Sequence, residues 1–174
     1  WEENNAAELS LSYGQITSFD SNGFTVNGTS QLNRSGDNFV SWNFKAGGAA
    51  VTNTDGTITS QVSANVEAGF SIVSYTTQSS GVATVGHGLG ISPNVVLVKT
   101  RGVADSWRMY HSSLGSNYQI YLNLTNASGV AANQWNNTAP TSSVFSLGTD
   151  NAGSYTTIAY CFAEVEGFSS FGSY

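Results

Sequence analysis

Short segments in which apolar and polar residues alternate recur along the chain about ten residues apart, with glycine, asparagine or aspartate between them. Successive side chains of a strand point to opposite faces of a sheet, so this alternation is typical of strands that bury one face. The clearest example is residues 50–64, where Asp55 and Gly56 are expected to form a tight turn and Ile58 and Val62 share one face. The sequence therefore predicts an all-β fold, an antiparallel, jelly-roll-like β-sandwich of about ten to twelve short strands.

The same alternation predicts where the strands lie and which aromatic side chains enter the core. It assigns Trp42 and Trp107 to the core and favours a turn at Asn22-Gly23. Besides the two strands of residues 50–64, the expected strands span residues 9–16, 39–44, 69–77, 82–85, 94–100, 107–111, 118–124, 144–147 and 155–165, and residues 19–26 hold the Asn22-Gly23 turn signal.

The composition supports this fold and excludes some partners. Charged residues make up only 9% of the chain, against about 25% in an average globular protein, so the usual material of helix surfaces is scarce. The net charge is −6, and the five basic residues form no stripe that could follow a phosphate backbone. We therefore expect no nucleic-acid partner, and no membrane insertion, because no apolar run is long enough to cross a bilayer. The lone cysteine, Cys161, is expected to pack as a small buried hydrophobe.

The chain also nearly repeats itself. GFSIVSY at Gly69–Tyr75 returns as GFSSFGSY at Gly167–Tyr174, and the blocks upstream of the two copies align Phe24 with Phe145. The aligned positions are those expected inside strands. We therefore interpret the repeat as a reused way of building a sheet.

The repeat suggests how the chain is organised. Its two blocks are residues 24–75 and 145–174, and the second ends where a new GFS unit has begun. We expect residues 19–174 to form a single β-sandwich module cut from a longer polypeptide, and residues 1–18 to be an N-terminal linker or edge strand.

The segment VGHGLGISP holds one of the two histidines. We interpret it as a structural turn around His87, in which Gly86, Gly88 and Gly90 adopt backbone angles closed to other residues. The other histidine, His111, is distant in sequence and no cysteine or acidic pattern accompanies it, so no metal site is predicted.

Paired carboxylates are the mark of a glycosidase. Glu164 and Glu166 are two residues apart on one strand face, and we interpret them as a solvated strand end. The aspartates, Asp150 among them, lie in turn-like contexts, where their side chains bond the backbone. We expect no catalytic residues and no cofactor, while a calcium ion held by turn carbonyls and aspartates stays open as an alternative.

Aromatic residues are the remaining candidates for ligand contact, because exposed Trp and Tyr stack on sugar rings and anchor interfaces. Trp135 lies in the polar loop AANQWNNTAP, beside the amides of Asn133 and Asn136, which could bond hydroxyl groups. With Tyr121, these residues form the predicted ligand-contact set. The alternative is that Trp135 folds back to cover the core.

Two groups of motifs resemble known virion proteins. VATVGHGLGISPNVVLVKTRGVADSWRMYH, residues 82–111, resembles a segment of tailed-bacteriophage tail fibres that combines HGLG-x-x-P, an apolar strand ending in VK and W-x-x-Y-H. WNFKAGG, VTNTDGTITSQVSAN, WNNTAPTSSVFSLG and TTIAYCFAEVEGFSSFGSY look like parts of a module of unassigned function in large proteins of marine phages, often cyanophages. The resemblance covers most of residues 38–174, and the family offers no established catalytic residues.

The resemblance implies a structure on the virion surface, outside the cell. The expected function is that of a non-enzymatic structural module, most simply part of a tail fibre or surface appendage that binds host-surface polysaccharide. Self-association into a homo-oligomer is expected, because such appendages are symmetric assemblies and exposed sheet edges need covering. The alternatives are a capsid decoration or filament-forming subunit, and a glycan depolymerase.

Overall fold

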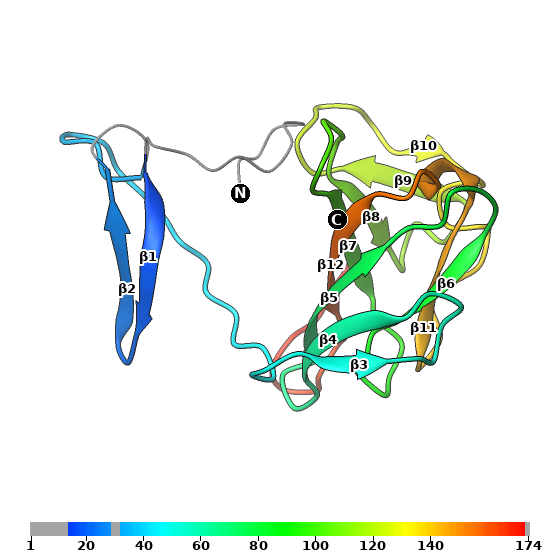
Figure 1. The fold of residues 1–174 in the computed structure, drawn as a ribbon, viewed down its shortest axis with the longest axis horizontal. Helices are drawn as coiled ribbons and strands as arrows, with labels where there is room; N and C mark the ends of the chain where they lie inside the picture. Colours follow the sequence, from blue (N-terminus) through cyan, green and yellow to red (C-terminus); the bar gives the residue numbers. More distant parts are fainter. Residues whose placement is uncertain (1–13, 29–31, 173–174) are drawn as a thin grey trace. The chain divides into compact units, whose positions relative to one another are not determined.

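The computed structural model describes residues 14–28 and 32–172 (Figure 1). Two compact units divide the chain, one within Leu9–Asn43 and the other within Phe44–Tyr174. The described elements are almost all strands: β1 (Gln15–Asp20), β2 (Gly23–Asn27), β3 (Val51–Asn53), β4 (Ser60–Asn65), β5 (Phe70–Thr76), β6 (Ala83–Gly86), β7 (Val95–Thr100), β8 (Arg108–His111), β9 (Tyr118–Tyr121), β10 (Gly129–Val130), β11 (Val144–Leu147), the 3-10 turn η1 (Thr149–Asn151) and β12 (Thr156–Phe162).

The first unit contains a β-hairpin. β1 and β2 pair antiparallel, with Phe19 opposite Phe24, and the strands are joined by Ser21 and Asn22. The turn thus falls within one residue of its predicted place. Phe19 is 82% exposed, so this hairpin buries little of its own apolar surface. Of the predicted strand 9–16, residues 9–13 lie outside the described residues.

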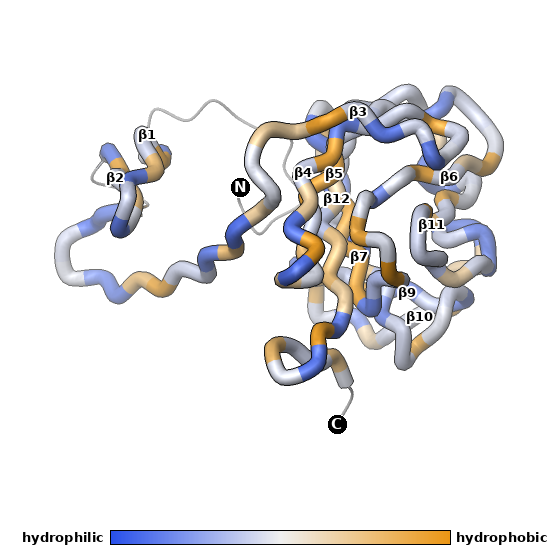
Figure 2. The backbone as a smooth tube through the Cα atoms, turned by 90° about the horizontal axis from the view of Figure 1, so that it is seen from below, coloured by the Kyte–Doolittle hydropathy of each residue, from blue (hydrophilic) through white to orange (hydrophobic). Residues whose placement is uncertain are grey.

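The second unit is an antiparallel β-sandwich, which confirms the predicted fold class. Its large sheet has eight strands in the order β10-β9-β8-β7-β12-β5-β4-β3, and β11 pairs with β6 in a small second sheet. The central strands β5, β7 and β12 are among the most apolar stretches of the chain (Figure 2). Their neighbours on both sides supply the backbone hydrogen bonds that such buried segments need.

The core lies between the two sheets. The large sheet contributes buried Val73, Val96 and Ala159, and the small sheet contributes Phe145 and Leu147. Alternation along each strand selects these residues, because partners directly opposite one another in antiparallel strands share a face. The burial of Ile58, Val62 and Cys161 matches the predicted alternation. Trp107 is buried as predicted, but it stacks on Tyr160 on the other face of the large sheet.

The strand predicted at residues 39–44 is wrong. Those residues form no strand, and Val40 and Trp42 are 71% and 72% exposed, so Trp42 is not a core residue. Alternation shows that a segment could form a strand, but it does not identify a neighbouring strand with which the segment would pair. In the large sheet, β3 occupies the edge position beside β4. Phe44, at the end of the segment, packs on the sandwich, against Phe70 and Phe162 at ring distances of 5.4 and 5.3 Å.

The predicted hairpin of residues 50–64 exists, but its tight turn does not. β3 ends at Asn53 and β4 begins at Ser60, so a longer loop joins them. This loop docks on β6, where the backbone N–H of Thr57 donates to Thr84 Oγ1 at 3.0 Å and that of Thr84 donates to Thr57 Oγ1 at 2.9 Å. A Cβ at Gly56 would overlap the Thr84 carbonyl, and the φ of Gly56 is not positive. Glycine at this position therefore lets the backbones of the loop and β6 approach each other closely, and it does not provide the φ of a tight turn.

The two copies of the sequence repeat occupy different structural positions. Gly69–Tyr75 covers most of β5, whereas Ser169 of the second copy forms only an isolated bridge with Val165. Phe24 lies in the exposed hairpin and its aligned residue Phe145 is buried in β11. The domain boundary expected at residue 19 also falls inside β1.

Candidate functional site

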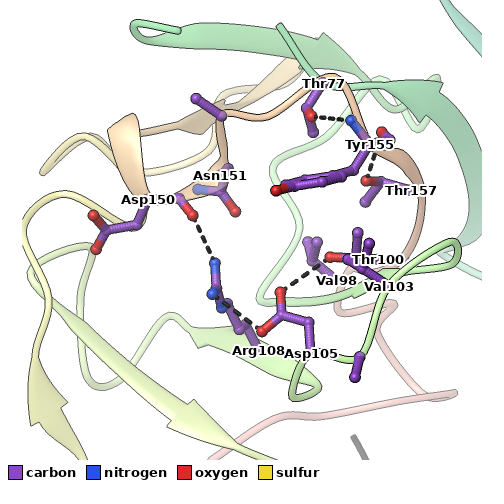
Figure 3. A pocket seen from close by; sticks show the side chains of 12 residues that line it. Thr77, Val98, Thr100, Val103, Asp105, Arg108, Asp150, Asn151, Tyr155 and Thr157 are labelled. Atoms are coloured by element: carbon purple, nitrogen blue, oxygen red, sulfur yellow. Dashed lines mark hydrogen bonds and ion pairs between the residues drawn. The ribbon is translucent and has the colours of Figure 1, made fainter. Parts of the chain in front are cut away.

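A pocket of about 270 Å³ opens on the second unit, at the end of the core where β7, β8 and β12 meet η1. Polar side chains surround it, with a few small apolar ones (Figure 3). We call it the Arg108 pocket. It is lined by Thr77, Val98, Thr100, Val103, Ala104, Asp105, Arg108, Asp150, Asn151, Ala152, Tyr155 and Thr157.

Strand register brings the pocket residues to one face. Thr100 on β7 lies opposite Thr157 on β12, and Val98 lies opposite Arg108 on β8. Opposite residues share a face, and Val98 belongs to the core, so all four point to the inner side of the large sheet. The inner face therefore changes from apolar to polar at this end of the strands.

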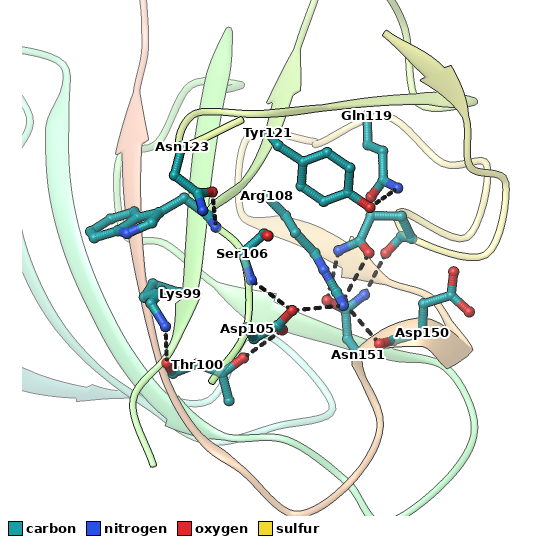
Figure 4. Close-up of polar contacts among 12 residues, drawn as sticks. Lys99, Thr100, Asp105, Ser106, Arg108, Gln119, Tyr121, Asn123, Asp150 and Asn151 are labelled. Carbon is teal, nitrogen blue, oxygen red and sulfur yellow. Dashed lines mark hydrogen bonds and ion pairs between the residues drawn. The ribbon is translucent and has the colours of Figure 1, made fainter. Parts of the chain in front are cut away.

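Arg108 is the centre of a polar network (Figure 4). Its Nη2 lies 3.2 Å from Asp105 Oδ1, and its Nη1 donates to Gln134 Oε1 at 3.1 Å and to the Asp150 carbonyl at 3.0 Å. The two charged side chains are only 20% and 27% exposed. Arg108 Nε is buried and has no hydrogen-bond partner among the described residues. The guanidinium is thus held from several sides.

Hydrogen bonds also fix the Asp105 carboxylate that pairs with Arg108. Its Oδ2 accepts a hydrogen bond from Thr100 Oγ1 at 3.0 Å, and its Oδ1 accepts one from the Ser106 N–H at 2.8 Å. Lys99 lies on the other face of β7, where its Nζ donates to the Thr100 carbonyl at 3.0 Å. Burial lowers the pKa of Lys99, and Asp105 counteracts that effect in part.

A buried amide pair supports the arginine. Gln134 Nε2 donates to Asn151 Oδ1 at 2.7 Å, and the Asn151 amide donates back to the Gln134 carbonyl. The residues are 1% and 9% exposed. Because buried amides are costly unless they are bonded, this pair fixes the position of the Gln134 oxygen that accepts from Arg108.

Tyr155 forms one wall of the pocket (Figure 3). Its backbone N–H donates to Thr77 Oγ1 at 2.9 Å, and its carbonyl accepts from Thr157 Oγ1 at 3.1 Å. The ring packs so closely on Gly153 that a Cβ there would overlap it, and Gly153 has a φ of 145°. The residue is 39% exposed, so part of the ring is available to a ligand.

The arrangement is suited to binding a small polar molecule. It combines a held aromatic ring, a carboxylate, a guanidinium and several hydroxyl groups around one concave space. Pockets with a few convergent polar groups and an aromatic surface are typical ligand sites. The close-up also shows that the Asp150 carboxylate points away from Arg108, so that Asp150 bonds the arginine through its backbone (Figure 3).

The family described as a domain of unknown function (DUF7483) matches residues 2–174. The chain belongs to this family. No match to the chain was found among curated proteins or among solved structures.

In this DUF7483 member, Trp135 is not an exposed ligand contact. It is 2% exposed and belongs to the core, with its ring 6.0 Å from that of Tyr110 in an edge-on arrangement. Short-range bonds close the loop around it: the N–H of Asn137 donates to the Ala132 carbonyl, and that of Thr138 donates to the Trp135 carbonyl, each at 3.0 Å. These turns direct the indole inward, so the alternative that Trp135 covers the core is the correct one.

The other predicted contact residues do not line the pocket. Asn133 and Asn136 are exposed, and Asn136 has a φ of 51° in a tight turn. Tyr121 is half-buried on β9 opposite Arg108, and its hydroxyl accepts from Gln119 at 2.7 Å. The predicted contact set therefore does not form the pocket.

His87 has the structural role expected of it. It is fully buried, and Gly88 and Gly90 have φ values of 70° and 75°, as predicted. Gly86 differs, because its φ is not positive; instead, the Asn53 side chain approaches it so closely that a Cβ would overlap it. Burial lowers the pKa of His87 more than its hydrogen bond to Thr141 raises it.

The acidic residues considered for catalysis lie in separate places. Asp150 lines the Arg108 pocket, whereas Glu164 accepts hydrogen bonds from Ser170 and Phe171 near the end of the chain. Among residues 14–28 and 32–172, no group of three or more His, Cys, Asp or Glu side chains could hold a metal ion. In the same part of the chain, no helix has the length and apolar character needed to cross a membrane.

One feature of the sequence indicates the pocket, although it is not among the predicted site residues. Alternation in Trp107–His111 puts Arg108 on the same face as the core residue Tyr110, and Asp105 precedes the arginine by three residues. A charged residue on a core face needs a partner. Tyr155 and Asn151 carried no such signal.

Proposed function

We propose that this chain is a non-enzymatic structural module of a bacteriophage virion, part of a tail fibre or similar surface appendage, and that it binds host-surface glycan through the Arg108 pocket. The Arg108 pocket is the observation that carries the proposal. A partly exposed Tyr155 ring beside fixed Asp105, Arg108 and threonine groups offers both stacking and hydrogen bonding. These are the two kinds of contact that a sugar ring makes.

The resemblance to tail-fibre segments supports the same assignment. The segment that carries it, residues 82–111, supplies both Asp105 and Arg108 of the pocket. One small pocket provides only a few contacts, so each copy would bind weakly. A homo-oligomeric appendage on the virion surface would multiply that affinity by presenting several copies at once.

The test compares two tyrosines of equal exposure. Tyr155 lines the pocket and Tyr118 does not, and both are 39% exposed. The full chain is measured on immobilised host polysaccharide, and Tyr155→Ala should weaken binding by at least about tenfold, whereas Tyr118→Ala should not. Equal losses in the two variants, or no binding by the wild type, contradict the proposal. Release of reducing sugar by the wild type would instead indicate a depolymerase.

A purely architectural role is the second candidate, and the outer face of the large sheet favours it. A row of apolar side chains crosses five strands there, each opposite the next: Ile72, Tyr160, Leu97, Met109 and Ile120. Sheet faces of this kind pack against other surfaces in assemblies. A large polymer in light scattering, together with no glycan binding, would support a capsid-decoration or filament subunit.

A further inference from the structure

We infer that the Arg108 pocket takes a single uncharged sugar residue, and that Asp105 excludes acidic sugars by neutralising Arg108. This inference rests on the proposed glycan-binding function and adds the class of sugar. It follows from the size of the pocket, its internal charge balance and the direction of its hydroxyl groups.

The volume limits the ligand to about one ring. Sites for drug-sized molecules occupy roughly 300–1,000 Å³. The Arg108 pocket, at about 270 Å³, lies just below that range. It therefore fits one terminal or branching residue of a glycan and not a longer stretch of chain.

The charged side chains that line the pocket, Arg108, Asp105 and Asp150, carry no net positive charge. The Arg108 guanidinium already donates hydrogen bonds to Asp105, to Gln134 and to the Asp150 carbonyl. A sugar carboxylate would have to displace the Asp105 carboxylate from Arg108 or sit beside it. Two carboxylates that share one site repel each other strongly when both are ionised.

The threonine hydroxyls are instead arranged for neutral hydroxyl groups. Thr100 Oγ1 donates to Asp105, and Thr157 Oγ1 donates to the Tyr155 carbonyl, so both oxygens present lone pairs to a ligand. Thr77 Oγ1 accepts from the Tyr155 N–H, which leaves its own hydrogen to donate. Two acceptors and one donor beside the Tyr155 ring complement the hydroxyls and the C–H face of a sugar.

The experiment uses pairs of sugars that differ at one carbon, where a neutral hydroxymethyl group in one sugar is an ionised carboxylate in the other. The full chain is titrated with methyl glucoside, methyl galactoside and methyl mannoside, and with the three corresponding methyl uronides. The wild type is expected to bind at least one neutral glycoside about tenfold more tightly than its uronide. This measurement needs no variant, so it stands even if a substitution affects folding.

A variant then tests the role of Asp105. Asp105→Asn keeps the shape of the side chain but removes the charge opposite Arg108, so uronide affinity should rise about tenfold. The control is Asp37→Asn, which removes the same charge from an Asp–Arg pair of the same spacing outside the pocket, Arg34–Asp37 at 2.7 Å, and should leave both affinities unchanged. Thermal unfolding of both variants confirms that they are folded.

The outcomes separate the two proposals. A wild type that prefers the uronide, or an Asp105→Asn variant with unchanged uronide affinity, overturns the inference while glycan binding stands. A wild type that binds neither the glycosides nor immobilised host polysaccharide overturns the proposed function itself. Both proposals are supported if the wild type and Asp37→Asn prefer the neutral sugar and Asp105→Asn does not.

Discussion

The Thr141 carbonyl oxygen lies 3.1 Å from Nε2 of His87 and ties together two loops that are 54 residues apart in the chain. The other ring nitrogen, Nδ1, accepts a hydrogen bond from the Leu89 N–H at 3.2 Å. Nδ1 therefore has no proton, and Nε2 donates to Thr141. This pattern requires a neutral imidazole, because the imidazolium form carries a proton on both nitrogens.

His87 should make the stability depend on pH. Burial lowers the pKa of His87 below its ordinary value of 6.5 in the folded state, so only the unfolded chain takes up the proton near that pH. The contribution of neutral His87 to the free energy of unfolding is complete above pH 6.5. It falls as the pH drops below 6.5, by up to about 1.4 kcal/mol per pH unit. Urea unfolding at pH 7.5 and 5.5 measures this loss. His87→Gln should reduce the pH dependence, and His111→Gln should keep it; equal dependence in all three proteins would exclude His87 as the cause.

Trp135 and Trp42 should behave in opposite ways when they are replaced by alanine. Trp135 is 2% exposed and Trp42 is 72% exposed. Trp135→Ala leaves a large cavity in the core and should lower the free energy of unfolding by about 3–5 kcal/mol. Trp42→Ala should change it by no more than about 0.5 kcal/mol. Chemical denaturation measures both, and similar losses at the two positions would contradict the assigned burial.

These two tryptophans show what local sequence can and cannot predict. Apolar runs locate β5 and β7 well, because strands with neighbours on both sides lie deep in the sheet and are largely buried. Residues 39–44 alternate as a strand would but form no strand, since the sequence does not say which edge is free. A polar loop around Trp135 likewise says nothing about the direction in which its turns point the indole.

The pocket could be predicted only in part for a related reason. Asp105 and Arg108 are three residues apart, so their pairing is a local event. Gln134 and Asp150, which also bond Arg108, are 26 and 42 residues away from it. Only the order of β7, β8 and β12 in the sheet, and the return of the chain through η1, bring these parts together. Strand order is a property of the whole fold and has no local pattern.

Glu164 should hold the backbone around Ser170 and Phe171 in place through its hydrogen bonds. Its Oε1 accepts hydrogen bonds from Ser170 Oγ at 2.7 Å and from the Phe171 N–H at 2.8 Å, and these bonds lower its pKa. Glu164→Ala should therefore speed amide hydrogen exchange at Phe171 while the unfolding midpoint changes little. Glu166→Ala, two residues further on, is the matched control and should leave that exchange unchanged. Unaltered exchange in Glu164→Ala would show that other contacts, such as that of the Phe171 ring with Phe162, are sufficient.

Cys161 should be unreactive in the folded protein. It is a free cysteine, completely buried on β12, and burial raises the pKa of its thiol to about 12. Only the thiolate reacts with disulfide reagents, so native protein at pH 8 should release almost no thionitrobenzoate from Ellman's reagent. In denaturant the same sample should release one equivalent per chain, because the sequence contains one cysteine. Rapid reaction without denaturant would mean that β12 separates from its neighbours β5 and β7 far more often than a central strand should.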